Sequence, residues 1–281
     1  MIEGAFTKIC FYIVAHADDW QLFMFPQVYV DILDEKTKTV FIITTAGDAG
    51  LDERFSAARE EGSKSSLRFC LAPFRNFRES EEIKIMTGHC IRRWSAGDAT
   101  FYFMRLPDGN LNGNGFASTN FQSLSKLVTG EIDSTTATDN SASYKGWTDV
   151  HATLETIILY ETGNIKERWI NYPNPDLIEN RNDHPDHIAT GKAVECISIT
   201  KNAFRRLFNG YKARHSRTNF AEQFWKIGMF AAYEKAVFDL SGYSTLKEDV
   251  DCYLRWCSGT SDCIVKYPEQ DPHPDIVFGE R

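Results

Sequence analysis

Short apolar runs alternate with longer amphipathic stretches along the first third of the chain. The runs at 9–15 (ICFYIVA) and 39–45 (TVFIITT) are continuous and rich in β-branched and aromatic residues, which predicts two buried strands. Helical stretches are expected after each of them, at 19–33 and 54–70. This strand–helix–strand–helix order predicts parallel strands with helices on the faces of the sheet. In such sheets the ligand site lies at the carboxyl ends of the strands, where residues 16–19 fall.

The rest of the chain continues this alternation less regularly. A third strand is expected at 100–105 (TFYFMR), ending in the turn Leu106-Pro107-Asp108-Gly109, and a Ser/Thr-rich stretch at 134–143 is typical of a loop or a flexible insertion. Further expected elements are a helix at 150–160, a strand at 168–172, a polar loop at 173–183, helices from 185 to about 200 and at 220–238, and an irregular tail.

Neither an internal repeat nor a strong linker divides the chain. We therefore expect a single α/β domain over 1–281, a Rossmann-like three-layer sandwich with a mostly parallel central sheet. Its motif-bearing part covers about 9–200, and a C-terminal helical extension covers about 201–281.

Charge and composition weigh against several classes of partner. The formal net charge of -8 disfavours nucleic acid, which is bound by clustered Lys and Arg. The sequence contains no run near the roughly 20 apolar residues of a membrane span, and residues 1–11 do not resemble a signal peptide. We expect a cytoplasmic protein with reduced thiols, which can be oligomeric. Cys252, Cys257 and Cys263 cluster near the end, but without a CxxC pair they are more typical of structural or free thiols than of a zinc site.

The first cluster with catalytic potential is His16-Ala17-Asp18-Asp19, directly after the first predicted strand. Adjacent residues in a strand-to-helix turn point in different directions, so one carboxylate can bind a metal ion while its neighbour faces the water on that ion. The cluster by itself is also compatible with Asp18 or Asp19 capping the following helix.

The second cluster is Asp183-His184-Pro185-Asp186-His187. Its two histidines, three residues apart at a helix start, project from about the same face, so one can be a ligand and the other an acid or electrostatic partner. Alone, it also fits a helix capped by Asp183 with surface histidines. However, three of the seven histidines lie in these two Asp-rich clusters, each beside a predicted strand end. Two histidines and one carboxylate on zinc leave a coordination position open for water, so the pair predicts metal-dependent hydrolysis.

A strand that ends in AHxDD, followed later by HPDH, resembles the LmbE-like or PIG-L family of zinc-dependent N-acetylglucosaminyl deacetylases, whose patterns are AHPDDE and HPDH. The second pattern matches in full at 184–187. The turn at 45–50 (TAGDAG) is close to the family's T-x-G-E-x-G, and Arg59 and Asp108 fall near further family positions. The likeness covers most of 9–200, and the chain after about 201 adds nothing diagnostic.

The resemblance implies an LmbE-like fold and one zinc ion per chain, bound by His16, Asp19 and His187. It makes Asp18 the general base for the attacking water, and a charged His184 the group that stabilises the oxyanion or protonates the leaving amine. Arg59 and Asp108 would hold substrate hydroxyls. The implied partner is a small-molecule N-acyl amino sugar or glycoconjugate, from which an N-acetyl or related acyl group is removed.

The chain departs from the family patterns in three places. Ala17 replaces Pro without removing a functional group. Trp20 replaces the acidic residue after the Asp pair, and Gly62 falls where the R-x-x-E part of the second helix has its acid. A supporting carboxylate that is lost has to be compensated elsewhere. We expect Trp20 to be a core residue of its helix rather than an apolar pocket wall for a longer acyl chain or an aromatic substrate.

Three other functions are alternatives at this point. A metal-dependent phosphoesterase also uses His/Asp clusters but usually needs a second metal ion, so one metal per chain would favour the deacetylase. A catalytically inactive carbohydrate-binding relative would keep the pocket; Trp20 favours it, whereas the intact Asp18 and His184 argue against it. A nucleotide-binding domain is weaker still, because the turn at 47–50 (GDAG) lacks the spacing of a dinucleotide site.

Overall fold

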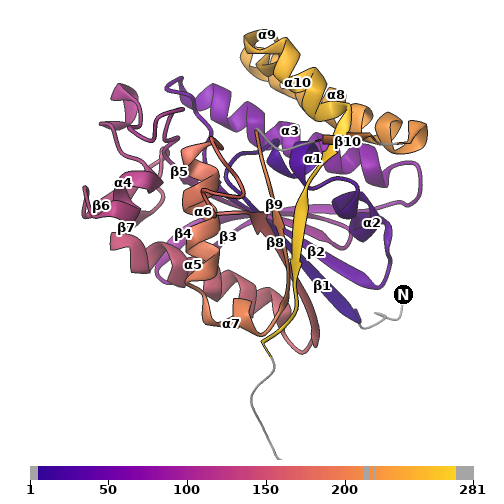
Figure 1. The fold of residues 1–281 in the computed structure, drawn as a ribbon, viewed down its shortest axis with the longest axis horizontal. Helices are drawn as coiled ribbons and strands as arrows, with labels where there is room; N and C mark the ends of the chain where they lie inside the picture. Colours follow the sequence, from indigo (N-terminus) through magenta and orange to yellow (C-terminus); the bar gives the residue numbers. More distant parts are fainter. Residues whose placement is uncertain (1–5, 212–214, 218, 270–281) are drawn as a thin grey trace, which may run out of the picture.

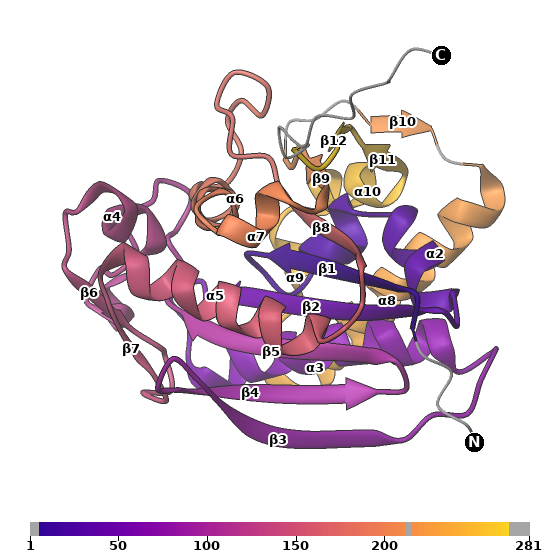
Figure 2. The same ribbon diagram turned by 90° about the horizontal axis from the view of Figure 1, so that it is seen from below.

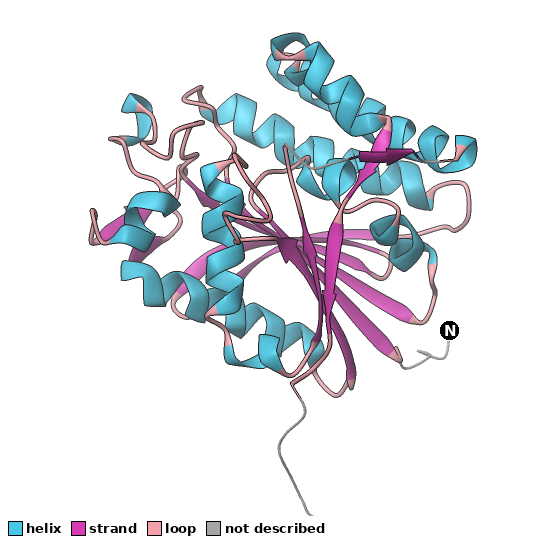
Figure 3. Cartoon of the chain, viewed as in Figure 1, coloured by secondary structure: helices cyan, strands magenta, loops and turns pink. Residues whose placement is uncertain are grey.

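An eight-stranded sheet lies between two layers of helices in the computed structural model, which describes residues 6–211, 215–217 and 219–269 (Figures 1 and 3). The strand order is β12-β9-β8-β1-β2-β5-β4-β3. The five central strands are parallel: β9 (Phe204–Phe208), β8 (Glu167–Pro173), β1 (Lys8–Val14), β2 (Thr37–Thr45) and β5 (Ala99–Leu106). The outer strands pair antiparallel: β12 (Cys263–Lys266) on one edge, and β4 (His89–Ala96) and β3 (Glu79–Met86) on the other. The predicted Rossmann-like α/β sandwich with a mostly parallel sheet is confirmed.

Alternate residues of the central strands face opposite helical layers. Tyr12 and Phe41 pack with the layer that contains α1 (Asp19–Phe23), α2 (Gln27–Leu33), α3 (Glu53–Leu71), α8 (Phe220–Ser241) and α10 (Val250–Cys257). Ile13 and Ile42 pack with the layer of α4 (Leu124–Thr129), α5 (Gly146–Thr162), α6 (Pro185–Glu195) and α7 (Ser198–Lys201). Figure 2 shows α5 in front of the sheet, with α3 and α8 behind it. Because both faces are covered, β1 and β2 are continuous apolar runs in the sequence.

Two predicted helices are each interrupted. The stretch 19–33 forms α1 and α2 with a break at 24–26, because Pro26 has no backbone N–H and disfavours a helical residue before it. The stretch from 185 to about 200 forms α6 and α7, separated by Cys196 and Ile197, and Ile197 has an extended backbone.

Two hairpins were not predicted. β3 and β4 pair along their whole length, but β3 is almost entirely exposed at the sheet edge, so its acidic residues obscure the alternation that marks a strand. The stretch 134–143 is not a flexible insertion: β6 (Ser134–Thr136) and β7 (Ser143–Lys145) form a hairpin whose Tyr144 is fully buried.

The segment after residue 201 is not simply a helical extension with an irregular tail. Its strands β9 and β12 complete the central sheet, and β10 (His215–Arg217) pairs with β11 (Gly259–Ser261). Its longest helix, α8, packs along α3, and α9 (Thr245–Glu248) and α10 follow it (Figure 1). Residues 270–281 of the predicted tail lie outside the described residues. No helix in the described part of the chain is long and apolar enough to cross a membrane.

Candidate metal centre and active site

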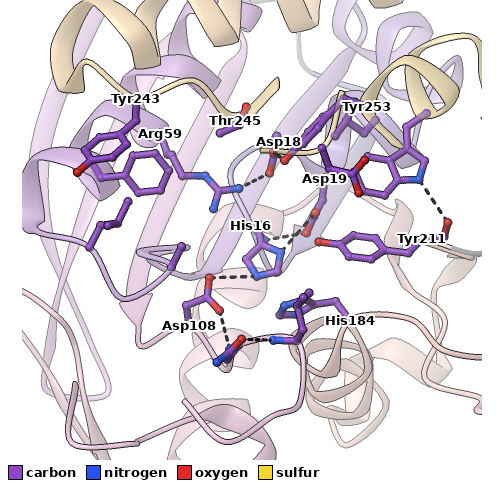
Figure 4. Close-up of a pocket in the computed structure, with 18 of the residues that line it drawn as sticks. His16, Asp18, Asp19, Arg59, Asp108, His184, Tyr211, Tyr243, Thr245 and Tyr253 are labelled. Carbon is purple, nitrogen blue, oxygen red and sulfur yellow. Dashed lines mark hydrogen bonds and ion pairs between the residues drawn. The ribbon is translucent and has the colours of Figure 1, made fainter. Parts of the chain in front are cut away.

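The two sequence clusters meet at the carboxyl ends of β1 and β8. Residues 16–19 follow β1, and residues 184–187 begin α6 after the loop that leaves β8. Both clusters contribute to a cavity of about 590 Å³, a volume suited to a small molecule. We call its charged and imidazole side chains from these clusters and their neighbours the polar floor (Figure 4): His16, Asp18, Asp19, Arg59, Asp108 and His184.

Three donor atoms converge beside this floor. His16 Nδ1 lies 3.3 Å from His187 Nε2 and 3.6 Å from Asp19 Oδ1, and His187 Nε2 lies 3.1 Å from the same oxygen. Ligand atoms bound tetrahedrally at zinc, with bonds of about 2.0–2.1 Å, are about 3.3 Å apart. The three atoms therefore have the spacing of three corners of a tetrahedral metal site. The structure brings together the predicted ligand set, and this group could hold a metal ion.

A carboxylate lies behind each of these two imidazoles. His187 Nδ1 is 2.9 Å from Asp183 Oδ1, and His16 Nε2 is 3.4 Å from Asp186 Oδ2. A carboxylate on one ring nitrogen fixes the proton there and directs the lone pair of the other nitrogen toward a metal ion. The alternative in which Asp183 caps α6 is wrong, because the side chain of His184 caps it: His184 Nδ1 accepts the N–H of Asp186 at 3.2 Å.

Buried carboxylates give this centre a strong preference for positive charge. Burial alone would lower the pKa of His16, but Asp19, Asp186 and Asp108 outweigh it and raise the pKa to about 10. Burial also opposes the charge of His187, yet Asp183 and Asp19 raise its pKa well above the ordinary value. In the absence of a metal ion, protons on the imidazoles supply the positive charge. A divalent cation fits the same donor set and would displace those protons on binding.

A second group of possible donors consists of His16, Asp108, His184 and Asp186. Its members other than His16 each already accept a backbone N–H. Asp108 Oδ1 accepts from Asn110 at 2.8 Å, and Asp186 Oδ2 accepts from Gly109 at 2.8 Å. His184 accepts through Nδ1, as described above. The bond from Gly109 to Asp186 holds the turn after β5 against the start of α6, and the other two fix the turn and the helix start themselves.

The surroundings of His184 disfavour the charged form that the family resemblance implies. Burial, reinforced by the charge on His16, lowers the pKa of His184 to about 4. Because Nδ1 accepts a backbone N–H, the proton of the neutral ring lies on Nε2. His184 is thus a neutral hydrogen-bond donor on the cavity wall rather than a cation.

Asp18 forms a buried ion pair with Arg59. Asp18 Oδ1 accepts from Arg59 Nη2 at 2.5 Å, and Asp18 Oδ2 accepts from the Tyr253 hydroxyl at 3.3 Å. Arg59 also donates through Nη1 to the Gly47 carbonyl at 2.7 Å and through Nε to the Tyr233 hydroxyl at 2.8 Å. A Cβ on Gly47, whose φ is +54°, would lie 2.4 Å from Arg59 Nη1, so glycine is required where the guanidinium meets this turn.

The roles predicted for Arg59 and Asp108 toward substrate hydroxyls stay predictions. Both residues line the cavity. However, three nitrogens of Arg59 already donate hydrogen bonds within the protein. In this structure Arg59 therefore binds Asp18, the turn at 45–50 and Tyr233.

The two positions that lack the family's acidic residue are both packed against aromatic side chains. Trp20 is fully buried against Phe41 and donates Nε1 to the Ser63 hydroxyl at 3.2 Å, and Ser63 in turn bonds to the Ala17 carbonyl. Trp20 does not line the cavity, which confirms the expectation of a core residue. Gly62 leaves room for a neighbour, since a Cβ there would lie 2.5 Å from the ring of Tyr233 on α8.

Residues of the C-terminal segment that the sequence did not single out form the opposite side of the cavity. We call them the C-terminal wall: Tyr211, Tyr243, Ser244, Thr245, Asp249, Tyr253 and Trp256. Figure 4 shows Tyr211, Tyr243 and Tyr253 around the polar floor. No short motif contains them, so only the fold reveals that they belong to the site.

Solved structures with similarity to this chain include three deacetylase structures. An N,N'-diacetylchitobiose deacetylase from Pyrococcus horikoshii is 14% identical, with 89% of this chain and 76% of that chain covered and a TM-score of 0.44. A deacetylase of teicoplanin biosynthesis is 14% identical, with 92% and 96% covered and a TM-score of 0.49. A zinc-inhibited form of a teicoplanin deacetylase is 13% identical, with the same coverage and a TM-score of 0.48. The identities and TM-scores of these three structures are too low to assign a function to this chain.

No curated protein matches the chain. The family assignment therefore depends on the match of residues 11–198 to PIG-L, described as GlcNAc-PI de-N-acetylase. That range contains both clusters and about two thirds of the sequence. The chain belongs to the PIG-L family.

Proposed function

We propose that this protein is a zinc-dependent hydrolase that removes an N-acyl group, in the first instance N-acetyl, from an amino sugar or glycoconjugate. The observation that carries this proposal is the convergence of three buried donor atoms, 3.1–3.6 Å apart, beside an Asp that is not one of them. Membership of the PIG-L family supports the reaction class. Zinc is preferred because two imidazoles and one carboxylate are a common ligand set of catalytic zinc.

Amide hydrolysis needs a deprotonated nucleophile, stabilisation of the carbonyl oxygen and a proton for the amine. A bound zinc ion lowers the pKa of water toward about 7 and polarises a carbonyl group. Asp18 takes the proton of the attacking water on Oδ2, because Oδ1 is held by Arg59. His184 donates its Nε2–H to the oxygen that gains negative charge. The protonated Asp18 then returns the proton to the leaving amine, since neutral His184 is a poor acid in this arrangement.

The cavity has the surfaces that a sugar needs. Asp108 and Asn110 line one side and offer polar groups to hydroxyls, while Tyr211, Tyr253 and Trp256 offer ring faces to the apolar side of a pyranose. We propose that the whole chain acts as one domain, because the wall comes from the segment after residue 201 and the floor from the segment before it.

A two-metal phosphoesterase is the second candidate, and the second donor group around Asp108 and Asp186 is the observation that favours it. The existing hydrogen bonds of that group to backbone N–H groups make it the weaker proposal. The number of metal ions per chain separates the two functions.

The test is amine release from a panel of N-acetylated amino sugars, with and without a substituent at the anomeric carbon. p-Nitrophenyl phosphate serves as the phosphoester control. We expect amine release that stops on chelation and returns with one equivalent of zinc. Phosphate release with two metal ions per chain, and no amine from any sugar, would replace the deacetylase with the phosphoesterase.

A further inference from the structure

We propose that Tyr253 is a positioning residue for Asp18, so that the C-terminal segment completes the catalytic machinery of the family-matched region. The inference rests on the proposed function, in which Asp18 is the general base. Tyr253 lies on α10, outside the matched range of 11–198. Its hydroxyl nevertheless reaches Asp18 Oδ2 at 3.3 Å, across 235 positions of the sequence.

An aromatic stack delivers two hydroxyls to the Asp18–Arg59 ion pair. Phe230 on α8 stacks on Tyr233 with ring centroids 5.9 Å apart and on Tyr253 with centroids 5.2 Å apart, at interplanar angles of 18° and 19°. The Tyr233 hydroxyl accepts from Arg59 Nε, and the Tyr253 hydroxyl donates to Asp18. Each member of the ion pair thus has its own tyrosine, and both tyrosines come from the C-terminal segment.

Hydrogen bonds from Lys226 on α8 hold the C-terminal end of α10, the helix that carries Tyr253. Lys226 on α8 is fully buried, and its Nζ donates to the carbonyls of Trp256 at 2.6 Å and Gly259 at 2.5 Å. Trp256 lies one helical turn after Tyr253, so the Lys226 amine binds carbonyl groups at the C-terminal end of α10, which have no partner within the helix. Trp256 Nε1 also donates to the Tyr211 carbonyl at 3.3 Å. These bonds fix the position from which Tyr253 reaches the site.

The hydroxyl can guide Asp18 without blocking it. A carboxylate oxygen has two lone pairs, so Oδ2 can accept from Tyr253 and from water together. Burial, together with the charge of Asp18, raises the pKa of Tyr253 well above its ordinary value, so the hydroxyl stays protonated and continues to donate. Arg59 on Oδ1 and Tyr253 on Oδ2 together define the rotation of the carboxylate. Proton transfer depends steeply on this geometry.

The departure of this chain from the family pattern at position 62 agrees with this role. Any side chain on Gly62 would collide with the Tyr233 ring, so the glycine permits the close packing of α8 on α3 that places the stack over Arg59. At the position where the family pattern has an acid, this chain thus packs a tyrosine of the C-terminal segment closely against the second helix.

A double-mutant cycle between Tyr253→Phe and Asp18→Asn tests the inference on the full-length, zinc-loaded protein. Tyr253→Phe keeps the ring and its stack, so we expect kcat to fall about tenfold, with KM within about twofold and zinc content unchanged. In the Asp18→Asn background the same change should lower the residual kcat no further, because the group it positions no longer acts as a base. Tyr29→Phe is the control. Tyr29 lies on α2, stacks on Trp225 of α8 and does not line the cavity, so we expect wild-type kcat.

Two results overturn the inference alone: wild-type kcat in Tyr253→Phe, or an equal tenfold loss in both backgrounds. The second result would mean that the hydroxyl acts on the fold and not through Asp18. If the wild-type protein releases no amine, the proposed function fails, and the inference fails with it because Asp18 then has no proton to move.

Discussion

The polar floor and the C-terminal wall of the cavity are built in different ways. Most of the floor comes from two clusters of four and five residues that follow β1 and β8, with Arg59 added from α3 and Asp108 from the turn after β5. Charge-assisted hydrogen bonds fix side chains of these clusters. The wall comes from residues scattered between 211 and 256, and ring stacking and the buried Lys226 hold it in place. The reaction chemistry is therefore compact in the sequence, whereas the surface that faces the substrate is dispersed.

The two regions meet in more than one place, since Tyr211 of the wall also lies against His184 of the floor, and one of these contacts involves the Asp18–Arg59 ion pair. Asp18 and Arg59 belong to the floor, and Tyr233 and Tyr253 hold them from α8 and α10. A change in the floor should abolish the chemistry, a change at the contact between the regions should weaken it, and a change in charge should act on stability. The following predictions separate these three effects.

Asp18→Asn should have the largest effect of the three. We expect kcat/KM for amine release to fall about a hundredfold or more, because an amide cannot take up the proton of water. Zinc content, measured by elemental analysis, should stay at the wild-type level because Asp18 is not among the three converging donors. Asp239→Asn, at an exposed position of α8, is the matched control and should keep full activity. Full activity in Asp18→Asn would remove this residue from the mechanism.

Gly62→Ala acts where α3 packs on α8, next to the tyrosine that binds Arg59. Its Cβ would lie 2.5 Å from the Tyr233 ring, so α8 or the ring has to move. We expect a loss of about 1–3 kcal/mol in the free energy of unfolding and a severalfold lower kcat, with zinc content retained. Ala57→Leu, which adds bulk at an exposed position of the same helix, should change unfolding by less than about 0.5 kcal/mol. An unchanged kcat in Gly62→Ala would show that the wall does not support the ion pair.

The charge of the metal centre should appear in the pH dependence of stability. His16 has an ordinary pKa of 6.5 and a pKa of about 10 in the folded, metal-free protein. Its stabilising contribution is complete below pH 6.5 and is lost as the pH rises through about 10. Denaturation of the metal-free protein across this range should show stability that falls with rising pH. Zinc should reduce this decline, because the ion then occupies the imidazoles in place of protons. A decline that is identical with and without zinc would contradict the assignment of His16.

Much of the fold and the chemistry could be predicted because the signals are local. Strands β1 and β2 are apolar runs covered on both faces, and residues 16–19 and 184–187 place ligand atoms within a few residues of a strand end. The interruption of the helix at Pro26 could also have been predicted from the sequence, since proline lacks the backbone N–H that a helix needs. The edge strand β3 could not be predicted, because its exposed acidic residues do not show the alternation of apolar and polar residues that marks a strand.

The rest of the site depends on tertiary contacts. From the sequence, a helix cap is an open alternative for Asp183, and only the fold shows that its carboxylate lies on His187 Nδ1. The charge of His184 depends on burial and on the neighbouring His16, neither of which is visible in the sequence. Tyr253 meets Asp18 only because α8 packs along α3 and α10 packs against α8 and α1. The significance of Gly62 is equally hidden until Tyr233 lies against it.

The measurement that tests the central claim most directly is the metal content per chain of the wild type and of His187→Ala, after loading with zinc and dialysis. His151→Ala, on α5 and outside both clusters, is the control. We predict about one zinc ion in the wild type and in His151→Ala, and little in His187→Ala, because His187 Nε2 is one of the three donors. Equal zinc in all three proteins, or none in the wild type, would contradict the account.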